Sequence, residues 1–258
     1  KRGAIVIDNS SAFRMDPEVP LVVPEVNPED ILKHKGIIAN PNCSTIIMSL
    51  GLKPLHDISP IKRIVVSTYQ AVSGAGKEGI EELENQVKQY TAGEEMTANL
   101  LPTGSAPKHY PVAFNLLPQI DVFLDNDYTK EEMKMVHETQ KILHDDTIQV
   151  VPTTVRVPVY RSHSESVLVE TEEPVSVEAF KAACEKFPGL QVKDNPAEQI
   201  YPMPLYTSNQ NDCEIGRIRK DLYNDKGMNF WIVGDQIRKG AALNALQIAE
   251  YLVEKQAF

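Results

Sequence analysis

Cys43 is the residue whose type and position in this sequence most favour nucleophilic chemistry. It follows the tight-turn sequence Asn-Pro-Asn at residues 40–42 and precedes an apolar run with helical spacing, so it is predicted to lie where a helix begins. Unpartnered backbone N–H groups and the positive end of the helix dipole favour the thiolate form of a cysteine at such a position. The alternative is a small buried apolar residue, which is the role of most free cysteines. Cys184 and Cys213 lack this setting, and we interpret both as structural.

A thiolate that attacks a carbonyl group needs a proton-transfer partner, which is most often a histidine. Among the six histidines, His163 stands out because it lies between Ser162 and Ser164 at a break between two predicted strands. His137 and His144 lie on a predicted acidic helix, and we interpret them as solvated. His163 is therefore the leading candidate among the six.

Arg156 lies in a β pattern whose other residues carry no charge. The planar guanidinium fork suits a bound carboxylate or phosphate, and the alternative is an internal salt bridge. Because Arg156 and His163 are seven residues apart, one straight strand would send them to opposite faces. The two residues can share a site only if the chain turns between them, and Pro158 and Ser162 favour such a turn.

Two further signals are weaker. Glu131 and Lys134 are three residues apart on a predicted helix and therefore lie on one face, where a solvated ion pair is the alternative to a binding role. The glycine-rich stretch from Ser73 to Gly76 follows a predicted strand and resembles a backbone cradle for a phosphate or a cofactor edge.

The elements that must position these residues alternate between strands and helices, which indicates an α/β fold with an α+β second domain. Strands are predicted over residues 4–8, 36–39 and 61–68, and the stretch 148–170 is predicted to form an antiparallel meander. Helices are predicted over residues 44–50, with Gly51 as the stop, and over 77–90, 129–143, 176–187 and 239–255. Thr129 and Glu132 match a capping box. The apolar stripe of the last helix is predicted to be Ala242, Leu246, Ala249 and Val253.

The composition excludes several classes of protein. A formal net charge of −10 without any basic block argues against a nucleic-acid partner. Three scattered cysteines are too few for a disulfide framework and indicate a reducing compartment. No apolar run has the length of a membrane span and no signal peptide is evident, so we expect a cytoplasmic protein. Because the 258-residue chain opens at Lys1 directly on a buried-strand pattern, we interpret it as beginning partway through a domain.

Taken together, the motifs resemble the aspartate-β-semialdehyde dehydrogenases of the bacterial type, over essentially the whole chain from Ala4 onward. The resemblance is carried, in order, by VIDNSSAFR, VPEVN, NPNCSTI, STYQAVSGAG, KEEMK, VRVPV followed by HSES, EIGRIRKD and GDQIRKGAA. It implies a glyceraldehyde-3-phosphate dehydrogenase-like fold, in which the end of a Rossmann-type domain precedes an α+β catalytic and dimerisation domain. Residues 1–39 would be the remnant of the NADP-binding domain, 40–233 the catalytic domain, and 234–258 a helix packing back on the nucleotide-binding part.

The resemblance also implies a role for each matching residue. The catalytic pair would be the nucleophile Cys43 and the general acid/base His163. The substrate would be bound by Gln70, Arg156 and Glu131. Inorganic phosphate would be bound by Arg14, Asn42 and Lys134. The cofactor NADP would contact Ser73, Gly74 and Gln236. No metal site is implied, and a homodimer is expected.

The implied activity is the NADP-dependent interconversion of L-aspartate-β-semialdehyde plus phosphate and L-4-aspartyl phosphate, through a cysteine thioester. This reaction serves lysine, threonine and methionine biosynthesis, including the diaminopimelate route. An N-acetyl-γ-glutamyl-phosphate reductase shares the architecture and remains an alternative enzyme. A non-catalytic dimerising module and a cofactor-independent Cys-His hydrolase are alternatives from other classes.

Overall fold

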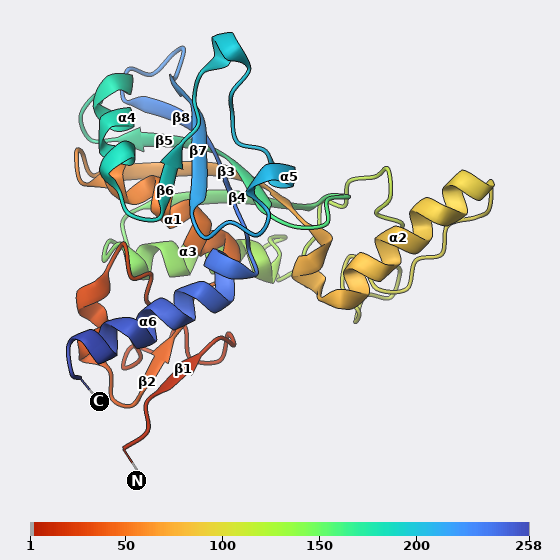
Figure 1. Cartoon of the computed structure of the whole chain (residues 1–258), viewed down its shortest axis with the longest axis horizontal. Helices are drawn as coiled ribbons and strands as arrows, with labels where there is room; N and C mark the ends of the chain where they lie inside the picture. Colours follow the sequence, from red (N-terminus) through yellow and green to blue (C-terminus); the bar gives the residue numbers. More distant parts are fainter. Residues whose placement is uncertain (1–2, 258) are drawn as a thin grey trace.

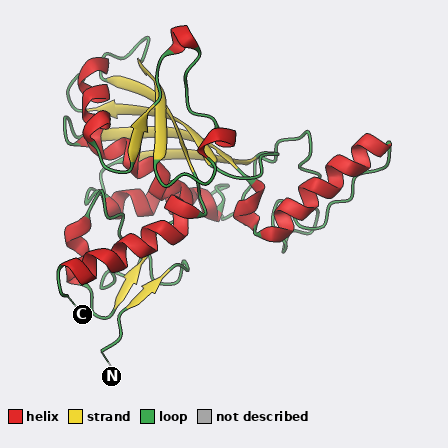
Figure 2. Cartoon of the chain, in the orientation of Figure 1, coloured by secondary structure: helices red, strands yellow, loops and turns green. Residues whose placement is uncertain are grey.

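A computed structural model describes residues 3–257 and divides them into a six-stranded sheet with its helices and a smaller unit that contains both termini (Figure 1). The smaller unit has two parallel strands, β1 (Val6–Asp8) and β2 (Ile37–Ala39), with helix α6 (Leu243–Glu254) packed on them. The two sheets are separate groups of strands, with helices lying between them (Figure 2). No helix among the described residues is long and apolar enough to cross a membrane.

The large sheet is mixed, with the strand order β4-β3-β5-β8-β7-β6. Its strands are β3 (Ile61–Gln70), β4 (Gln149–Arg156), β5 (His163–Thr171), β6 (Leu190–Val192), β7 (Cys213–Lys220) and β8 (Gly227–Gly234). The predicted meander over residues 148–170 is wrong, because β4 and β5 lie on opposite sides of β3, parallel and antiparallel to it. Residues 157–162 pass over the end of β3, where the carbonyls of Val159 and Tyr160 accept the N–H groups of Val72 and Ser73.

Three helices pack against the large sheet: α1 (Cys43–His56), α3 (Lys130–Ile142) and α4 (Val177–Lys186), while the short α5 (Pro204–Thr207) contacts β8. The prediction that Gly51 ends the first helix is wrong, since α1 continues to His56 with Pro54 inside it. Gly51 serves packing instead: a Cβ there would lie 2.8 Å from the Phe230 ring. The absence of a side chain lets α1 approach the sheet closely.

The boundaries of the next three helices, α2 (Lys77–Ala92), α3 and α4, agree with the sequence signals. Thr129 and Glu132 form the predicted capping box at the start of α3, with both reciprocal hydrogen bonds present. The side chain of Ser176 caps α4. Helix α2 extends away from the sheet, and the chain returns beside it (Figure 1). This arm follows the 3₁₀ turn η2 (Val72–Ala75) and has its own apolar core, which includes Val72, Leu83, Leu101 and Val112.

The predicted apolar stripe of the last helix is wrong. The buried residues of α6 are Asn244, Ile248 and Leu252, whereas Leu246 and Val253 are 53% and 65% exposed. The helix carries apolar residues on more than one face, and the face packed on β1 and on the 3₁₀ turn η1 (Pro28–Lys33) is the buried one. A π-helical turn, η4 (Arg238–Ala242), precedes α6, so the α-helix begins four residues later than predicted.

Candidate active site

The ends of five strands, the segments that follow them and helix α3 bring nine of the eleven predicted site residues to one cavity of about 520 Å³. Loops after the carboxyl ends of β1 and β2 supply Arg14, Asn42 and Cys43. Strand β3 ends at Gln70 and its partner β4 ends at Arg156, which is directly opposite Gln70 in the register. Strand β5 runs the other way and begins at His163, so its start lies at the same edge. The turn that the sequence requires between Arg156 and His163 is therefore present.

Cys43 is the first residue of α1, and its side chain is the only one of the three cysteine side chains that is not fully buried. The side chain of Asn42 caps this helix by accepting the N–H groups of Ser44 at 3.0 Å and Thr45 at 3.4 Å. Burial, reinforced by the negative charge of Glu131 and opposed by Arg156, raises the pKa of Cys43 to about 12. The prediction of a lowered pKa is thus wrong for this structure, because loss of solvation outweighs the helix terminus.

Cys184 and Cys213 are both fully buried in the main core, which confirms their structural interpretation. Burial raises the pKa of Cys184 to about 12 and that of Cys213 further. Thiol pKa therefore does not distinguish Cys43 from the other two cysteines. Cys43 is distinguished from the other two cysteines by its access to the cavity.

His163 is held in one orientation, since its Nδ1 accepts the backbone N–H of Ala71 at 3.1 Å. A neutral imidazole with Nδ1 as acceptor carries its proton on Nε2. Burial and the nearby charge of Arg156 hold the pKa of His163 well below its ordinary value, which favours this neutral form. Among the described residues Nε2 has no hydrogen-bond partner. The ring therefore presents a free N–H donor to the cavity.

Arg156 is 4% exposed, and its Nη1 donates to the carbonyl of Ala71 at 2.6 Å. No carboxylate within residues 3–257 forms an ion pair with it, so the alternative of an internal salt bridge is wrong. Gly74 packs directly on this pair of side chains, and a Cβ there would lie 2.9 Å from Arg156 Nη1 and 3.3 Å from His163 Cε1. We call Gln70, Arg156 and His163 the sheet wall of the cavity.

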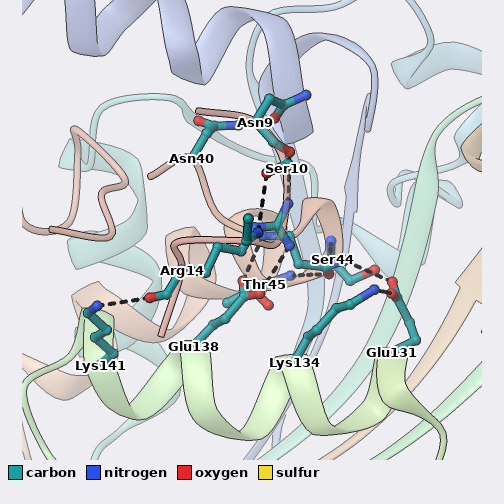
Figure 3. Close-up of polar contacts among 12 residues, drawn as sticks. Asn9, Ser10, Arg14, Asn40, Ser44, Thr45, Glu131, Lys134, Glu138 and Lys141 are labelled. Carbon is teal, nitrogen blue, oxygen red and sulfur yellow. Dashed lines mark hydrogen bonds and ion pairs between the residues drawn. The ribbon is translucent and has the colours of Figure 1, made fainter. Parts of the chain in front are cut away.

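On the side formed by α3, the cavity is lined by Glu131 and Lys134. We call these two residues, together with Glu138 on the same helix face, the helix wall (Figure 3). Glu131 accepts hydrogen bonds from Asn42 at 3.0 Å and Gln70 at 3.3 Å, and it pairs with Lys134 at 3.1 Å. The side chains of Glu131 and Lys134 are only 7% and 20% exposed. The alternative of a solvated surface pair is therefore wrong.

Glu138 is a member of the helix wall that the sequence analysis missed. One of its oxygens accepts the Asn42 backbone N–H at 2.6 Å, and the other pairs with Arg14 Nη1 at 3.1 Å (Figure 3). Arg14 Nη2 also donates to the Asn9 carbonyl at 3.2 Å. The available signal was the spacing of Glu138, seven residues after Glu131 and four after Lys134, since it places all three on one helix face.

One of the three predicted cofactor residues lines the cavity, and the other two do not. Gly74 lines the cavity, whereas Ser73 and Gln236 do not. Gln236 donates to Ser73 Oγ at 2.5 Å and accepts the backbone N–H of Ser162 at 2.8 Å, which joins η2 to the start of β5. Residues 74–79 match the letters G-x-G-x-x-G, which the sequence analysis missed. This run follows β3 of the mixed sheet, however, and not the parallel pair β1–β2.

Comparisons with known proteins place the chain in a family. The family model for the semialdehyde dehydrogenase dimerisation domain matches residues 52–239, and that for the semialdehyde dehydrogenase NAD binding domain matches residues 1–34. The aspartate-semialdehyde dehydrogenases of Aquifex aeolicus and Bacillus subtilis are 55% and 51% identical over 99% and 98% of this chain, which spans 74% and 73% of their lengths.

The crystal structure of aspartate semialdehyde dehydrogenase II from Vibrio cholerae, also solved in complex with ASA, has a TM-score of 0.91 at 47% identity, covering 98% of this chain and 73% of that protein. Sequence and structure therefore agree on the same relatives, and these relatives match over nearly the full length of the chain. The chain belongs to the aspartate-semialdehyde dehydrogenase family of oxidoreductases.

Proposed function

We propose that this chain carries the catalytic centre of an NADP-dependent, phosphorylating aspartate-semialdehyde dehydrogenase that works through a thioester on Cys43. One observation carries the proposal. A cysteine at a helix N-terminus, a neutral histidine donor, an arginine without a counter-ion and two cations on the far side line the same cavity of about 520 Å³. The family relatives support this substrate over the N-acetyl-γ-glutamyl-phosphate alternative.

The charges on the two walls fit the two ends of an amino-acid semialdehyde. The Arg156 fork, which has no carboxylate partner among the described residues, suits the α-carboxylate of the substrate. The buried carboxylate of Glu131 suits the α-ammonium group, with Gln70 hydrogen-bonded beside it. Bound in this way, each charged end of the substrate meets a wall residue of the opposite charge.

The reaction begins when the thiol of Cys43 releases its proton to solvent and its sulfur bonds to the aldehyde carbon, so that the carbonyl π electrons move to the oxygen, which becomes an oxyanion. The Nε2–H of His163 is the donor that stabilises this charge, which is the acid half of the predicted acid/base role. A bound nicotinamide would supply the oxidant, and loss of the hydride from the same carbon leaves a thioester on Cys43.

Phosphate then completes the turnover at the helix wall. A phosphate oxygen bonds to the thioester carbon, the C–S bond breaks, and the thiolate of Cys43 leaves. Lys134 and Arg14 are the cations placed to bind the incoming anion, close to Asn42 and the N-terminus of α1. The products are aspartyl phosphate, the reduced nicotinamide and one proton, and the cysteine is regenerated.

The residues present fit the nicotinamide end of a cofactor. Gly74, which has no room for a side chain, borders the cavity beside Arg156 and His163. Ser73 and Gln236 would hold the ring from behind this position. The match of residues 1–34 to an NAD binding domain supports a nicotinamide cofactor. The preference for NADP is proposed from the family resemblance.

We extend the proposal to assembly and domain limits. The face of the large sheet that carries Tyr69 and Trp231 is partly exposed beside a cavity of about 350 Å³, and the dimerisation-domain match covers it. A homodimer through this face is expected. The chain would divide at residues 39 and 233, with α6 joining the nucleotide-binding part, and the activity would serve lysine, threonine and methionine biosynthesis.

The test of the mechanism is Cys43→Ser in the complete reading frame that contains this sequence. We expect turnover, followed as phosphate-dependent NADPH formation, to fall by at least about 10⁴-fold because the covalent step is lost. Circular dichroism should be unchanged. The control variant, Cys184→Ala, should keep its turnover. Retained activity in Cys43→Ser, or faster labelling of Cys184 than of Cys43 by iodoacetamide, would contradict the proposal.

A comparison of rates on two substrates tests the choice of semialdehyde. Aspartate semialdehyde should react with a higher kcat/KM than N-acetylglutamate semialdehyde, because Glu131 has no ammonium partner in the acetylated compound. The opposite preference would favour the reductase alternative.

A further inference from the structure

Asp121 makes an ion pair within the cavity that the proposed reaction does not use. It lies in the loop before α3, and its Oδ2 is 3.1 Å from the ammonium of Lys134. The side chains of Asp121 and Lys134 are 30% and 20% exposed. Both residues line the cavity with Arg14 and Glu131. The ammonium proposed to bind phosphate is therefore already in contact with a carboxylate.

The position of Asp121 is held by several contacts. Its backbone has a φ of 69°, a left-handed conformation in which Asp and Asn are enriched among residues other than glycine. Its Oδ1 accepts the Val122 N–H at 2.9 Å, and its carbonyl accepts from the Gln119 side chain at 3.1 Å. Burial opposes its ionisation, but the Val122 N–H and Lys134 outweigh burial, so the pKa of Asp121 is lowered. The carboxylate is therefore charged at neutral pH.

The three carboxylates near the phosphate cations differ in their other contacts. Glu138 holds Arg14 and the Asn42 N–H, and Glu131 holds Asn42 and Gln70 as well as Lys134. Asp121 differs from both, because Lys134 is its single side-chain partner within residues 3–257. Removing Glu131 or Glu138 would disturb the positions of several site residues. Removing the charge of Asp121 would change the electrostatics of Lys134 and little else.

We infer that Asp121 is an internal competitor of phosphate: it neutralises Lys134 and thereby keeps phosphate binding weak. The inference rests on the proposed role of Lys134 as a phosphate ligand. An anion that approaches Lys134 must share the ammonium with Asp121 and approach its negative charge. Weak binding suits a group that must leave again whenever the reaction runs toward the semialdehyde. Asp121 would therefore set the phosphate affinity of the site without contacting the reacting atoms.

The experiment compares Asp121→Asn with Asp127→Asn. Asp127 lies in the same loop, is exposed and also has a positive φ of 63°, so its substitution changes the net charge equally at a distance from the cavity. Inorganic phosphate is titrated calorimetrically into each protein, and its KM is measured in the complete enzyme. We expect Asp121→Asn to lower both Kd and KM about three- to tenfold at low salt, as removal of one nearby charge allows. Asp127→Asn should change them by less than about twofold.

A double-mutant cycle with Lys134→Ala tests separately whether Lys134 binds phosphate and whether Asp121 weakens that binding. If Asp121 acts mainly through Lys134, Asp121→Asn should tighten phosphate binding much less in the Lys134→Ala background than in the wild type. An unchanged phosphate Kd in Lys134→Ala alone would reject the phosphate site itself. A raised Kd in Lys134→Ala combined with no tightening in Asp121→Asn would reject only the competitor role.

Two further outcomes would also overturn the inference. A higher phosphate Kd in Asp121→Asn would mean that the carboxylate positions Lys134 for the anion. A higher semialdehyde KM with unchanged phosphate binding would mean that Asp121 binds the substrate ammonium. Asp121→Gly, which also permits the positive φ, provides a second variant should the first fail to fold, and it should show the same tightening.

Discussion

On the helix wall, each charged side chain has an oppositely charged partner, whereas on the sheet wall Arg156 and His163 have none within residues 3–257. Both walls nevertheless border the same cavity, and all of their side chains except that of Lys134 are buried. The two walls differ in how far a bound ligand would compensate their charges and hydrogen-bond donors. A paired cation is already neutralised, while an isolated guanidinium and a free N–H donor are compensated only when substrate arrives.

The two walls are therefore expected to have different roles. The paired network holds the segments that carry Arg14, Asn42 and Lys134 in place, so its removal should affect stability and anion binding. The sheet wall keeps its hydrogen-bonding capacity for the reacting substrate, so its removal should affect turnover and substrate affinity. The predictions below test whether the two walls can be separated in this way, beginning with the largest expected effect.

His163→Asn should lower kcat by about 10²–10⁴-fold and leave the KM for the semialdehyde nearly unchanged, because the N–H donor acts on charge that develops during the reaction. Steady-state kinetics of the complete enzyme measures the effect. His137→Asn is the matched control, since His137 is exposed on α3, and it should behave as the wild type. An effect of His163→Asn confined to KM would assign the residue to binding.

Glu138→Ala should lower the free energy of unfolding by about 3 kcal/mol, because it leaves the buried Arg14 and the Asn42 N–H without their acceptor. Urea unfolding measures the loss. Glu170→Ala removes an exposed partner of Arg63 and should cost less than about 1 kcal/mol. Equal losses in the two variants would show that the helix wall does not depend on its buried pair.

Arg156→Lys keeps the charge but loses the planar fork, so the KM for the semialdehyde should rise about 10–100-fold, the cost of one hydrogen bond to a charged group. The accompanying fall in kcat should be smaller. Arg63→Lys, at an exposed ion pair on β3, is the control and should leave the kinetics unchanged. A fall in kcat that exceeds the rise in KM would move Arg156 from recognition to chemistry.

The features of this arrangement that depend on neighbouring residues could be predicted from the sequence. The turn before Cys43, the capping box at Thr129 and the ends of most helices depend on neighbouring residues, and the structure has them. The resemblance also selected nine residues that line one cavity. Local chemistry was enough for these features because backbone geometry and capping act over a few residues.

The missed features depend on partners distant in the sequence. Nothing near β4 and β5 indicates that β3 lies between them, because strand pairing is decided by residues 86 to 110 positions away. The buried face of α6 depends on β1 and η1 at the opposite end of the chain. The pKa of Cys43 depends on burial by the assembled walls, which a helix-terminus argument omits. Asp121 lies in a loop without periodicity.

The smallest expected effect concerns pH, because two buried groups on β5 have pKa values shifted in opposite directions. Burial and Arg156 lower the pKa of His163 below its ordinary 6.5, so its contribution to stability is complete above pH 6.5 and is lost as pH falls. Burial raises the pKa of Glu165, two residues further along β5, above its ordinary 4.5, so its contribution is lost as pH rises above 4.5.

Glu165→Gln should therefore become more stable relative to the wild type as pH rises from 5 to 7, by up to about 1.4 kcal/mol per pH unit. His163→Asn should show the opposite trend between pH 6.5 and 5, becoming more stable relative to the wild type as pH falls. Urea unfolding at each pH measures both slopes. Asp121→Asn is the control from the other side of the cavity. The pKa of Asp121 lies below 3.8, so the loss of its contribution to stability is confined to more acidic solutions. Parallel stability curves for Glu165→Gln and the wild type between pH 5 and 7 would show that Glu165 is ionised in the folded protein.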